Sequence, residues 1–493
     1  MSMSEALTKA LPLLYALERR GYETVFVGGC VRDTLLGKPL KDIDIATAAL
    51  PEQVIAVFPQ TIPTGLQHGT VTVVQEKETY EVTTFRTESA YERFRRPAQV
   101  EFVTALDEDL RRRDFTINSM AMRSDGAIVD PFGGQDDLRR RRLRCVGDAD
   151  ARLQEDALRI VRAVRFAAAY DLRIAPMTWR AIIRYRERLV HIAMERVGLE
   201  LDKMIAGSRP NRAAALLASS GMLAWTKERL PAAMLDAAEA YAKAKAVRRH
   251  AAIAESPLAV ASAGTGAAAS AGRRMALIAR TMRRLHLITD SEDRWAAVCA
   301  ALSLRGGQAS ELFGLLKYSS QRSARLAAIM GLHEAMSLRL LSHTDAADAA
   351  RDVMIAEETG IDSRTDEPEL RAHWRLSVLK HGKPAAAGWL AVVGAIPELA
   401  FGTAGIGERV SSAEAKLNRL RESLQTMPAC SVKELAVKGK DLLSLAGKPS
   451  GPWLGALLQR LLEAAALGRV PNERESLLAE AAALLQTKER EIE

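Results

Sequence analysis

The chain has 493 residues, enough for a large hydrophobic core and about three or four domains. Its 48% hydrophobic and 26% charged residues are ordinary for a soluble globular protein, and the lack of a run of 18 apolar residues argues against a membrane partner. A formal net charge of +8 favours a polyanionic partner. The widely spaced cysteines fit free thiols in a reducing cytoplasm, which is the expected location; they are Cys30, Cys145, Cys299 and Cys430.

The predicted secondary structure changes character along the chain. Residues 1–20 have the spacing of an amphipathic helix and do not resemble a signal peptide. Strands are predicted at about 23–28, 41–46, 69–75 and 79–86. From about residue 150 nearly every segment has helical periodicity, beginning with helices at 155–170, 176–190 and 195–206. The pattern predicts an α+β fold, in which a small mixed-sheet head is followed by helices alone.

A pair of aspartates, Asp42 and Asp44, lies in one of these predicted strands. Alternate side chains of a strand share a face, so both aspartates should lie on one face, with Ile43 and Ile45 in the core. Two nearby carboxylates repel each other, and a cation relieves that repulsion. Mg²⁺ prefers such oxygen ligands and often bridges to substrate phosphates. The pair therefore predicts magnesium-dependent phosphoryl or nucleotidyl transfer, and a solvated turn is the simpler alternative.

The segment before the aspartates has the composition of a phosphate-binding turn. Residues 25–27 predict a buried strand, and Gly28 and Gly29 allow the backbone to turn tightly and approach a phosphate. A short helix over 30–36 then points its first amide groups toward the same space. Arg32, in its first turn, is placed to bind a triphosphate, although a strand-turn-helix corner with an ordinary surface arginine has the same pattern.

Two further segments carry candidate site residues. Glu81 lies mid-strand, beside the position expected for the aspartates, and three carboxylates on adjacent strands can hold two metal ions. The alternative is an edge-strand glutamate that faces water. In the basic segment 111–120, Arg113 could bind triphosphate charge and Asn118 could bond a sugar or backbone group. A solvated basic turn is the alternative for this segment.

The first predicted helix after the sheet carries a regular series of charges. It opens within residues 155–166 with Asp156, Arg159, Arg162 and Arg165, which are spaced by three and should be neighbours on the helix surface. An aspartate beside an arginine offers acceptors and donors that match the edge of cytosine or adenine. Such a pair could choose a base without a nucleic-acid template, whereas a surface ion-pair ladder is the alternative.

These motifs, and the order in which they follow one another along the chain, resemble those of the class II tRNA nucleotidyltransferase and bacterial poly(A) polymerase family. The matching segments are 28–37, 42–44, 81–86, 112–118 and 155–159, and residues 194–200 resemble the family's neck motif. The resemblance is dense over residues 23–206. It implies a polymerase-β-like head in which Asp42 and Asp44 bind Mg²⁺ and Glu81 is a supporting catalytic acid.

The resemblance also implies which residues bind the incoming nucleotide. They are Gly28, Gly29, Arg32, Arg113, Asn118, Asp156, Arg159, Arg162 and Arg165. Among them, Asp156 and Arg159 would make the Watson–Crick-like contacts. The implied reaction is the addition of C, C and A to the 3′ end of tRNA from CTP and ATP, with no nucleic-acid template. The sequence leaves the oligomeric state open between monomer and homodimer.

The resemblance divides the chain into four expected domains. They are a catalytic head at 1–148, a base-recognising helical neck at 149–206, a helical body at 207–425 and a tRNA-binding helical tail at 426–493. The Ala/Ser/Gly-rich stretch 262–272 predicts a flexible insert in the body, near 255–275.

Two segments favour one branch of the family. Residues 86–97 resemble the flexible loop that enzymes adding only CC have shortened, and residues 451–473 resemble the tail of CCA-adding enzymes from Bacillus-like bacteria. A bacterial poly(A) polymerase and an enzyme that adds only CC or only A remain alternatives. A noncatalytic RNA-binding adaptor with an inactive head is the alternative outside the enzymes.

Overall fold

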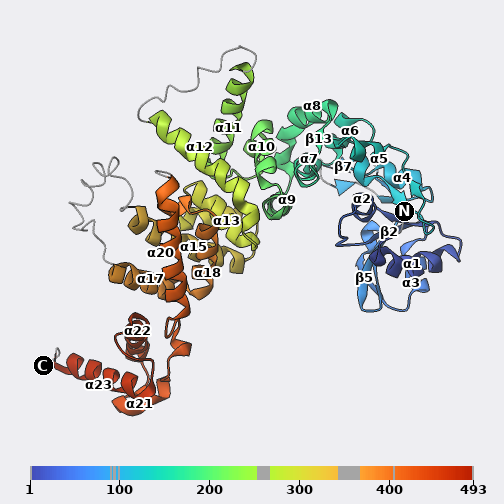
Figure 1. The fold of residues 1–493 in the computed structure, drawn as a ribbon. Helices are drawn as coiled ribbons and strands as arrows, with labels where there is room; N and C mark the ends of the chain where they lie inside the picture. Colours follow the sequence, from blue (N-terminus) through green and yellow to red (C-terminus); the bar gives the residue numbers. More distant parts are fainter. Residues whose placement is uncertain are drawn as a thin grey trace. The chain divides into compact units, whose positions relative to one another are not determined.

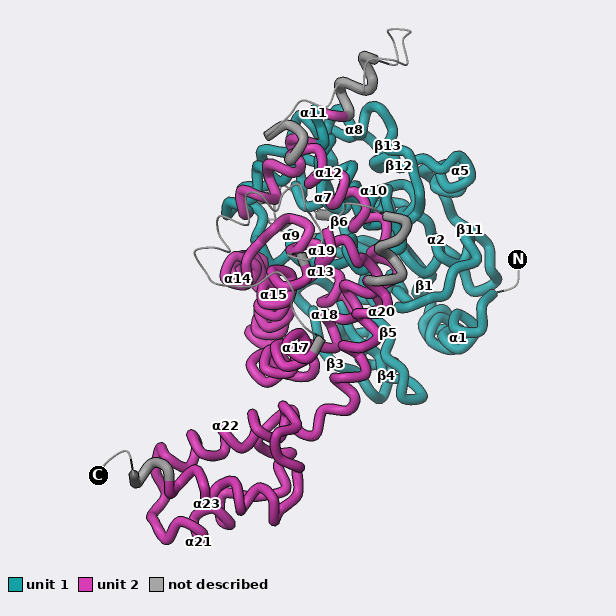
Figure 2. Tube along the Cα trace, turned by 60° about the vertical axis from the view of Figure 1, so that its left-hand side comes forward, with its two compact units in different colours: residues 1–230, 241–243 teal, residues 231–240, 244–493 magenta. Residues whose placement is uncertain are grey.

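The computed structural model describes residues 3–88, 91–92, 96–97, 100–251, 267–341, 367–402 and 406–490. The chain forms two compact units, which Figure 2 shows in different colours. Unit 1 comprises residues 1–230 and 241–243, and unit 2 comprises residues 231–240 and 244–493. Among the described residues, no helix is long and apolar enough to cross a membrane.

Unit 1 begins with a seven-stranded mixed sheet in the order β11-β10-β1-β2-β5-β4-β3. Its strands are β1 (Thr24–Val27), β2 (Asp44–Thr47), β3 (Thr61–Gly65), β4 (Thr70–Gln75), β5 (Glu78–Thr84), β10 (Ala121–Met122) and β11 (Ile128–Val129). The neighbours β2 and β5 run parallel, and the other pairs run antiparallel. The predicted strands at 23–28, 69–75 and 79–86 are therefore confirmed, whereas β3, β10 and β11 escaped prediction.

Short strands and helices surround this sheet. The strand pairs are β6 (Arg86–Glu88) with β9 (Val100–Phe102), β7 (Tyr91–Glu92) with β8 (Arg96–Pro97), and β12 (Arg142–Leu143) with β13 (Arg173–Ile174). The helices are α1 (Glu5–Glu18), α2 (Gly29–Leu35), α3 (Pro51–Val57), α4 (Leu106–Arg111) and α5 (Gly134–Arg139). Helices α1 and α3 pack against each other and the sheet (Figure 1). The predicted loop at 86–97 lies partly outside the described residues.

Helices complete unit 1. They are α6 (Ala149–Glu155), α7 (Leu158–Ala169), α8 (Pro176–Tyr185), α9 (Met194–Ala206) and α10 (Pro210–Ser220). Helix α7 packs on α9 and α10, and α6 packs on α8. The continuous helix predicted over 155–170 is wrong, because Asp156 has an extended backbone (φ −131°, ψ 106°) that separates α6 from α7. The helix predicted over 176–190 ends at Tyr185 and continues as the 3₁₀-helix η3 (Arg186–His191).

Unit 2 is built from helices. They are α11 (Ala232–Ala251), α12 (Ala267–Arg284), α13 (Ser291–Ala301), α14 (Gly306–Leu315), α15 (Ser320–Leu341), α17 (Glu367–His381), α18 (Lys383–Ala395), α19 (Glu398–Phe401), α20 (Ile406–Gln425), α21 (Gly439–Ala446), α22 (Pro452–Leu467) and α23 (Arg474–Arg490). Helix α15 packs against α13, α14, α17 and α18, around the fully buried Trp295, Trp374 and Trp389. The predicted α+β architecture, a mixed sheet followed by helices, is confirmed.

The expected insert near 255–275 has two parts. Residues 255–266 lie outside the described residues, and 267–275 belong to α12. The prediction of a loop is wrong for 267–272, because the alanines there have the highest helix propensity of any residue. All four cysteines are free, as expected, and the structure also shows them buried.

Candidate active site

Unit 1 contains a cavity of about 620 Å³ into which widely separated segments project. Its walls come from α2, the residues before β2, the segment after α4, and helices α7 and α9. The predicted residues that line it are Gly28, Gly29, Arg32, Asp42, Asp44, Arg113, Asn118, Asp156, Arg159, Arg162 and Arg165. Every predicted site residue except Glu81 therefore shares this cavity.

The aspartate pair lies at one wall of this cavity, in a geometry that differs from the prediction. Strand β2 begins at Asp44, so Asp42 precedes the strand and is exposed, while Ile45 is buried and Ile43 only partly so. Burial raises the pKa of Asp44, and the charges of Glu81 and Asp42 raise it further. Arg113 and Arg32 oppose this rise only in part. The site therefore concentrates negative charge that a bound cation would stabilise.

Glu81 lies beside the pair on the next strand. It is exposed and pairs with Asp44 in the parallel register of β2 and β5. Glu81, Asp42 and Asp44 also line a second cavity of about 700 Å³ in unit 1. Among the described side chains, however, no three His, Cys, Asp or Glu residues are grouped closely enough to hold a metal ion. The expectation of a preformed three-carboxylate site is therefore not met, and Asp42 and Asp44 remain the candidate ligands.

The glycine turn brings the backbone close to the cavity. Gly28 has φ 72° and ψ −122°, which only glycine adopts readily, and it precedes α2. A Cβ at Gly28 would lie 3.0 Å from Nη1 of Arg113 and 3.8 Å from Oδ2 of Asp44. The absence of a side chain at this position therefore allows a cation and a carboxylate of the site to approach the turn.

Arg32 is buried and held by several partners. Its Nε and Nη2 donate to the two carboxylate oxygens of Asp33, at 3.0 and 2.9 Å, and it also donates to Asn118 and Tyr170. The guanidinium carbon lies 4.2 Å from the centre of the Tyr170 ring. These contacts fix the guanidinium and join α2 to Tyr170, which directly follows α7, so a phosphate would meet an arginine that is already positioned.

Arg113 keeps part of its hydrogen-bonding capacity unused. Its Nη2 donates to Asp109 at 3.0 Å, and that buried carboxylate also pairs with Arg112. The buried Nε of Arg113 has no hydrogen-bond partner among the described residues. A buried donor without a partner is costly, so Arg113 is less completely satisfied by the protein than Arg32 is.

The positions of Asn118 and Arg162 depend on a carboxylate that the motifs alone did not single out, Asp114. Asn118 Nδ2 donates to Oδ1 of Asp114 at 3.0 Å, and Arg162 donates to Oδ2 through Nε at 2.8 Å. Burial alone would raise the pKa of Asp114, but Arg162, Asn118 and Arg159 lower it to about 2. Asp114 is therefore ionised at neutral pH and orients two of the predicted site residues.

Asp156 and Arg159 are not neighbours on one helix surface, as their spacing predicted, and the ion-pair ladder given as the alternative does not join them. Asp156 precedes α7 and accepts from the backbone N–H of Leu158 at 2.9 Å, as a capping aspartate does. Its other oxygen accepts from Nη2 of Arg196 at 3.0 Å. Arg159 instead donates to Glu155 at 2.6 Å. Each of the two candidate base-reading side chains is thus held by a separate partner.

The last two arginines of the series converge on helix α9. Arg165 donates to Glu200, and Arg162 lies 4.0 Å from the same carboxylate. The guanidinium carbon of Arg165 also lies 3.9 Å from the centre of the Phe166 ring. These contacts hold both cations at the cavity.

Four residues that position the site were missed by sequence reasoning. They are Asp114, Tyr170, Arg196 and Glu200. Three of them lie within segments already noticed, since Asp114 belongs to 112–118 and Arg196 and Glu200 to 194–200. Tyr170 carries no local signal, because its role depends on the packing of α7 beside α2.

Three family models match the chain. They are described as the poly A polymerase head domain at residues 24–144, the probable RNA and SrmB-binding site of polymerase A at 171–231, and a putative tRNA nucleotidyltransferase domain 2 at 400–481. The first match contains the glycine turn and the aspartates. The third shows that the likeness extends into unit 2.

Curated and solved relatives match almost the whole chain. A CCA-adding enzyme of Geobacillus stearothermophilus is 35% identical over 97% of both chains, and one of Geobacillus thermodenitrificans is 36% identical over 97% of both. The crystal structure of the Bacillus stearothermophilus CCA-adding enzyme in complex with CTP has a TM-score of 0.69 at 32% identity, covering 99% of this chain and 100% of that chain. This chain therefore belongs to the CCA-adding enzyme family of tRNA nucleotidyltransferases.

Proposed function

We propose that this protein adds C, C and A to the 3′ end of tRNA, using CTP and ATP and releasing pyrophosphate, without a nucleic-acid template. The observation that carries the proposal is one cavity that combines two aspartates with arginines from α2, the segment after α4, and α7. The full-length likeness to CCA-adding enzymes supports the same reaction. The 3′ hydroxyl of tRNA would attack the α-phosphorus of the nucleotide in line with the leaving pyrophosphate.

The cations of the cavity suit a triphosphate. Arg32 is fixed by Asp33 and Asn118, Arg113 is held by Asp109, and both arginines line the cavity. Arginine presents several donors in a planar fork that matches phosphate oxygens. These residues would bind and orient the triphosphate, so their contribution to catalysis is positioning and charge stabilisation.

Membership of this family implies the use of a divalent metal ion. Asp42 and Asp44 fit that role, since both line the cavity and burial, together with the charges of Glu81 and Asp42, raises the pKa of Asp44. Mg²⁺ is the ion we propose, because it binds through one or two carboxylates and completes its shell with substrate phosphates. When bound, it would supply charge neutralisation and activate the attacking hydroxyl.

Asp156 and Arg159 are proposed to choose the base. Cytosine and adenine both present an exocyclic amine, which a carboxylate accepts from, and a ring nitrogen acceptor, which a guanidinium donates to. Arg196 holds Asp156, and Glu155 holds Arg159, so neither side chain turns freely. Preformed donors and acceptors on the protein would replace the template strand.

The proposed division of labour follows the expected domains. The head at 1–148 would carry the reaction, the neck at 149–206 would choose the base, and the body at 207–425 and tail at 426–493 would hold tRNA. The net charge of +8 suits such a polyanion. We propose a cytoplasmic location, where tRNA and nucleotides are available.

Defined tRNA ends test the function directly. Transcripts that end before CCA, after C or after CC are incubated with CTP alone, ATP alone or both, and the products are resolved by length and sequenced. We expect completion to CCA with both nucleotides and no further extension. Long A-tails on arbitrary RNA would indicate a poly(A) polymerase, and a stop after CC would indicate a partial enzyme. Absence of any addition would leave only an RNA-binding adaptor.

A further inference from the structure

The cavity proposed to hold the nucleotide contains one more cation, Lys203, which neither the motifs nor the proposed reaction uses. Lys203 lies in α9, near the end of that helix, and lines the same cavity as Arg32, Asp42 and Asp44. Its side chain is 59% exposed. A charged side chain that lines a ligand cavity and stays in contact with water can meet an incoming anion without first breaking a buried contact.

The carboxylate beside Lys203 is already engaged by another residue. Among the described side chains, the only ion-pair partner of Lys203 is Glu200, with 4.0 Å between Nζ and Oε1. Glu200 is buried, and its other oxygen accepts from Nε of Arg165. Arg162 also lies 4.0 Å from Oε1, although its close partner is Asp114. Two carboxylates therefore face three cations, and this end of the cavity keeps an excess of positive charge.

The spacing of residues on α9 places Lys203 away from the proposed base readers. Arg196, Glu200 and Lys203 are four and three residues apart, so they share one face of the helix. Arg196 donates to Asp156, a proposed base reader, at 3.0 Å. Seven residues of α-helix place Lys203 about 10 Å further along the axis. Since Arg196 and Lys203 both line the cavity, Lys203 lies at a distance from the base that only the extended part of a nucleotide would reach.

An aromatic ring connects this end of the cavity to the proposed phosphate-binding arginine of α2. The guanidinium carbons of Arg165 and Arg32 lie 3.9 and 5.4 Å from the centre of the Phe166 ring. Phe166 is buried and lines the cavity. Glu200 joins Lys203 to Arg165, and Phe166 joins Arg165 to Arg32, so Lys203 and Arg32 belong to the same end of the cavity.

We propose that Lys203 binds the β- and γ-phosphates of the incoming nucleotide. The proposal deepens the proposed function and rests on it. The lysine ammonium is a compact charge on a flexible stem, so it can follow the phosphates of CTP and of ATP, whereas Arg32 is held in one position. The same two phosphates leave as pyrophosphate. Lys203 would therefore also neutralise the charge that develops on the leaving group.

A series of cytidine nucleotides tests this assignment in the full-length protein. The dissociation constants of CTP, CDP and CMP are measured by isothermal titration calorimetry with Mg²⁺ and without tRNA, and pyrophosphate is then titrated as a competitor of CTP. The proteins are the wild type, Lys203→Gln, which removes the charge, and Lys203→Arg, which keeps it. Circular dichroism verifies that each variant is folded, as the exposure of Lys203 leads us to expect.

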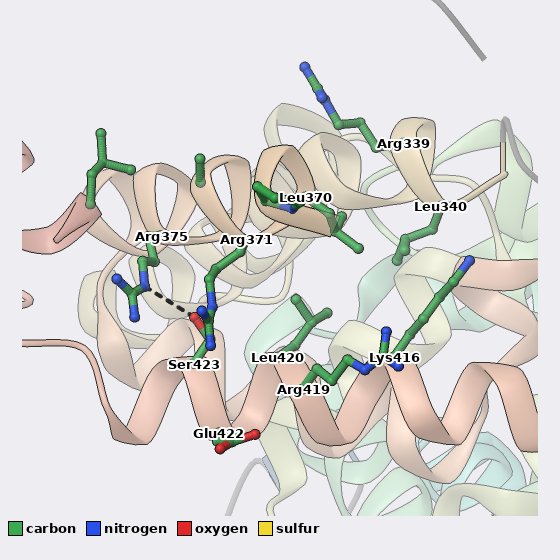
Figure 3. Close-up of a pocket in the computed structure, with 13 residues that line it drawn as sticks. Arg339, Leu340, Leu370, Arg371, Arg375, Lys416, Arg419, Leu420, Glu422 and Ser423 are labelled. Carbon is green, nitrogen blue, oxygen red and sulfur yellow. Dashed lines mark hydrogen bonds between the residues drawn. The ribbon is translucent and has the colours of Figure 1, made fainter. Parts of the chain in front are cut away.

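The control variant is Arg371→Gln. It removes one positive charge from unit 2, where Arg371 of α17 lines a separate cavity together with residues of α15 and α20 (Figure 3). Arg371→Gln changes the net charge of the chain as Lys203→Gln does, but it leaves the nucleotide cavity intact. Its affinities for the three nucleotides should therefore equal those of the wild type.

Lys203→Gln should weaken CTP binding roughly 10-fold, because a charge-assisted contact to phosphate is lost. Pyrophosphate should become a weaker competitor by a similar factor. The loss should be smaller for CDP, and CMP binding should stay within about twofold of the wild type, since CMP has neither of the two outer phosphates. Lys203→Arg should keep most of the affinity for CTP.

The nucleotide series also separates the possible results. No loss in Lys203→Gln, or an equal loss for CTP, CDP and CMP, would overturn the role of Lys203. A raised KM for tRNA with unchanged affinities for CTP and pyrophosphate would assign Lys203 to the RNA and likewise overturn it. If the wild type binds CTP but adds nothing to tRNA, a selective loss of CTP in Lys203→Gln would leave the Lys203 contact standing while the proposed function fails. Absence of CTP binding by the wild type would overturn both.

Discussion

At the scale of single residues, Asp114 organises much of the candidate site. It accepts from Arg162 and Asn118, and Asn118 in turn accepts from Arg32. One buried carboxylate thus links a predicted phosphate-binding residue of α2 to the arginine series of α7. Its role is positioning, since the groups expected to touch the nucleotide are its partners.

Asp114→Asn should destabilise unit 1 and weaken nucleotide binding, because the variant leaves Arg162 without its charged partner. Removing one member of a buried ion pair costs about 3–5 kcal/mol. The pKa of Asp114 is lowered to about 2 in the folded chain, so the ionised form stabilises the fold above about pH 4. This contribution is lost as the pH falls from about 4 toward 2.

Urea unfolding of the wild type and Asp114→Asn over this pH range checks the linkage. The difference in unfolding free energy should shrink by about 2 kcal/mol between pH 4 and pH 2. Asp136→Asn, at an exposed ion pair, is the matched control and should show a much smaller change. A pH-independent difference for Asp114→Asn would contradict the proposed role of its charge.

The choice of base is the second prediction at this scale. Asp156→Ala and Arg159→Ala should lower the selectivity for CTP and ATP more than they lower the affinity for tRNA, because both side chains are proposed to read the base. Arg196→Gln should have an intermediate effect, since it frees Asp156 without removing it. Competition between CTP, ATP, UTP and GTP on defined tRNA ends measures selectivity. Unchanged selectivity in Asp156→Ala and Arg159→Ala would refute protein templating.

At the scale of secondary-structure elements, the site depends on where elements begin. Strand β2 begins at Asp44, a candidate metal ligand, and α7 begins after Asp156, a candidate base-reading residue. Each of these two carboxylates therefore lies at the start of an element. The ends of elements leave backbone groups and side chains available for ligands. The glycine turn before α2 has the same property.

Gly28→Ala should impair activity and stability together. The new Cβ would require a positive φ and would lie 3.0 Å from Nη1 of Arg113. Positive φ in an alanine costs about 1–2 kcal/mol, and displacement of Arg113 adds a loss of nucleotide affinity. Gly37→Ala is a matched control, because Gly37 has φ 63° and no atom lies within 4 Å of the Cβ that alanine would add there. Equal loss of CTP affinity in both variants would contradict a specific role for the Gly28 turn.

Sequence periodicity predicted elements well where the pattern is local and failed where long-range packing decides. Alternation located β4 and β5, and helical spacing located α9. Strands β3, β10 and β11 carry weaker patterns and are fixed by their neighbours in the sheet. The break at Asp156 was missed because helical spacing on both sides hides a capping aspartate.

The same distinction applies to the candidate site. The motifs singled out eleven residues that line one cavity, because glycine turns and charge series have local signatures. Their partners could not be read from spacing, since Arg196 contacts Asp156 across 40 positions of sequence. For Glu81, the sequence correctly predicted a position beside Asp44 on the neighbouring strand. It did not predict the distances between the carboxylates, and among the described residues these three do not form a cluster that could hold a metal ion.

At the scale of the whole molecule, the chain divides into two compact units, and the candidate active site lies within unit 1.

CTP should stabilise unit 1 specifically. A ligand that binds only the folded state adds about 2.7 kcal/mol of stability at a concentration of 100 Kd. In differential scanning calorimetry, CTP with Mg²⁺ should raise the unfolding temperature of the transition assigned to unit 1. The destabilised Asp114→Asn variant identifies that transition. An equal shift of a separate unit 2 transition would contradict the placement of the nucleotide site.

Asp42 and Asp44 are the residues that should make the cavity of unit 1 catalytic. The sharpest test is single-turnover addition of CTP to a tRNA lacking CCA, by the wild type and by Asp42→Ala. We predict that Asp42→Ala loses addition while its tRNA affinity stays within about twofold, because the exposed carboxylate serves the reaction and not the fold. Addition by Asp42→Ala at the wild-type rate would contradict this role.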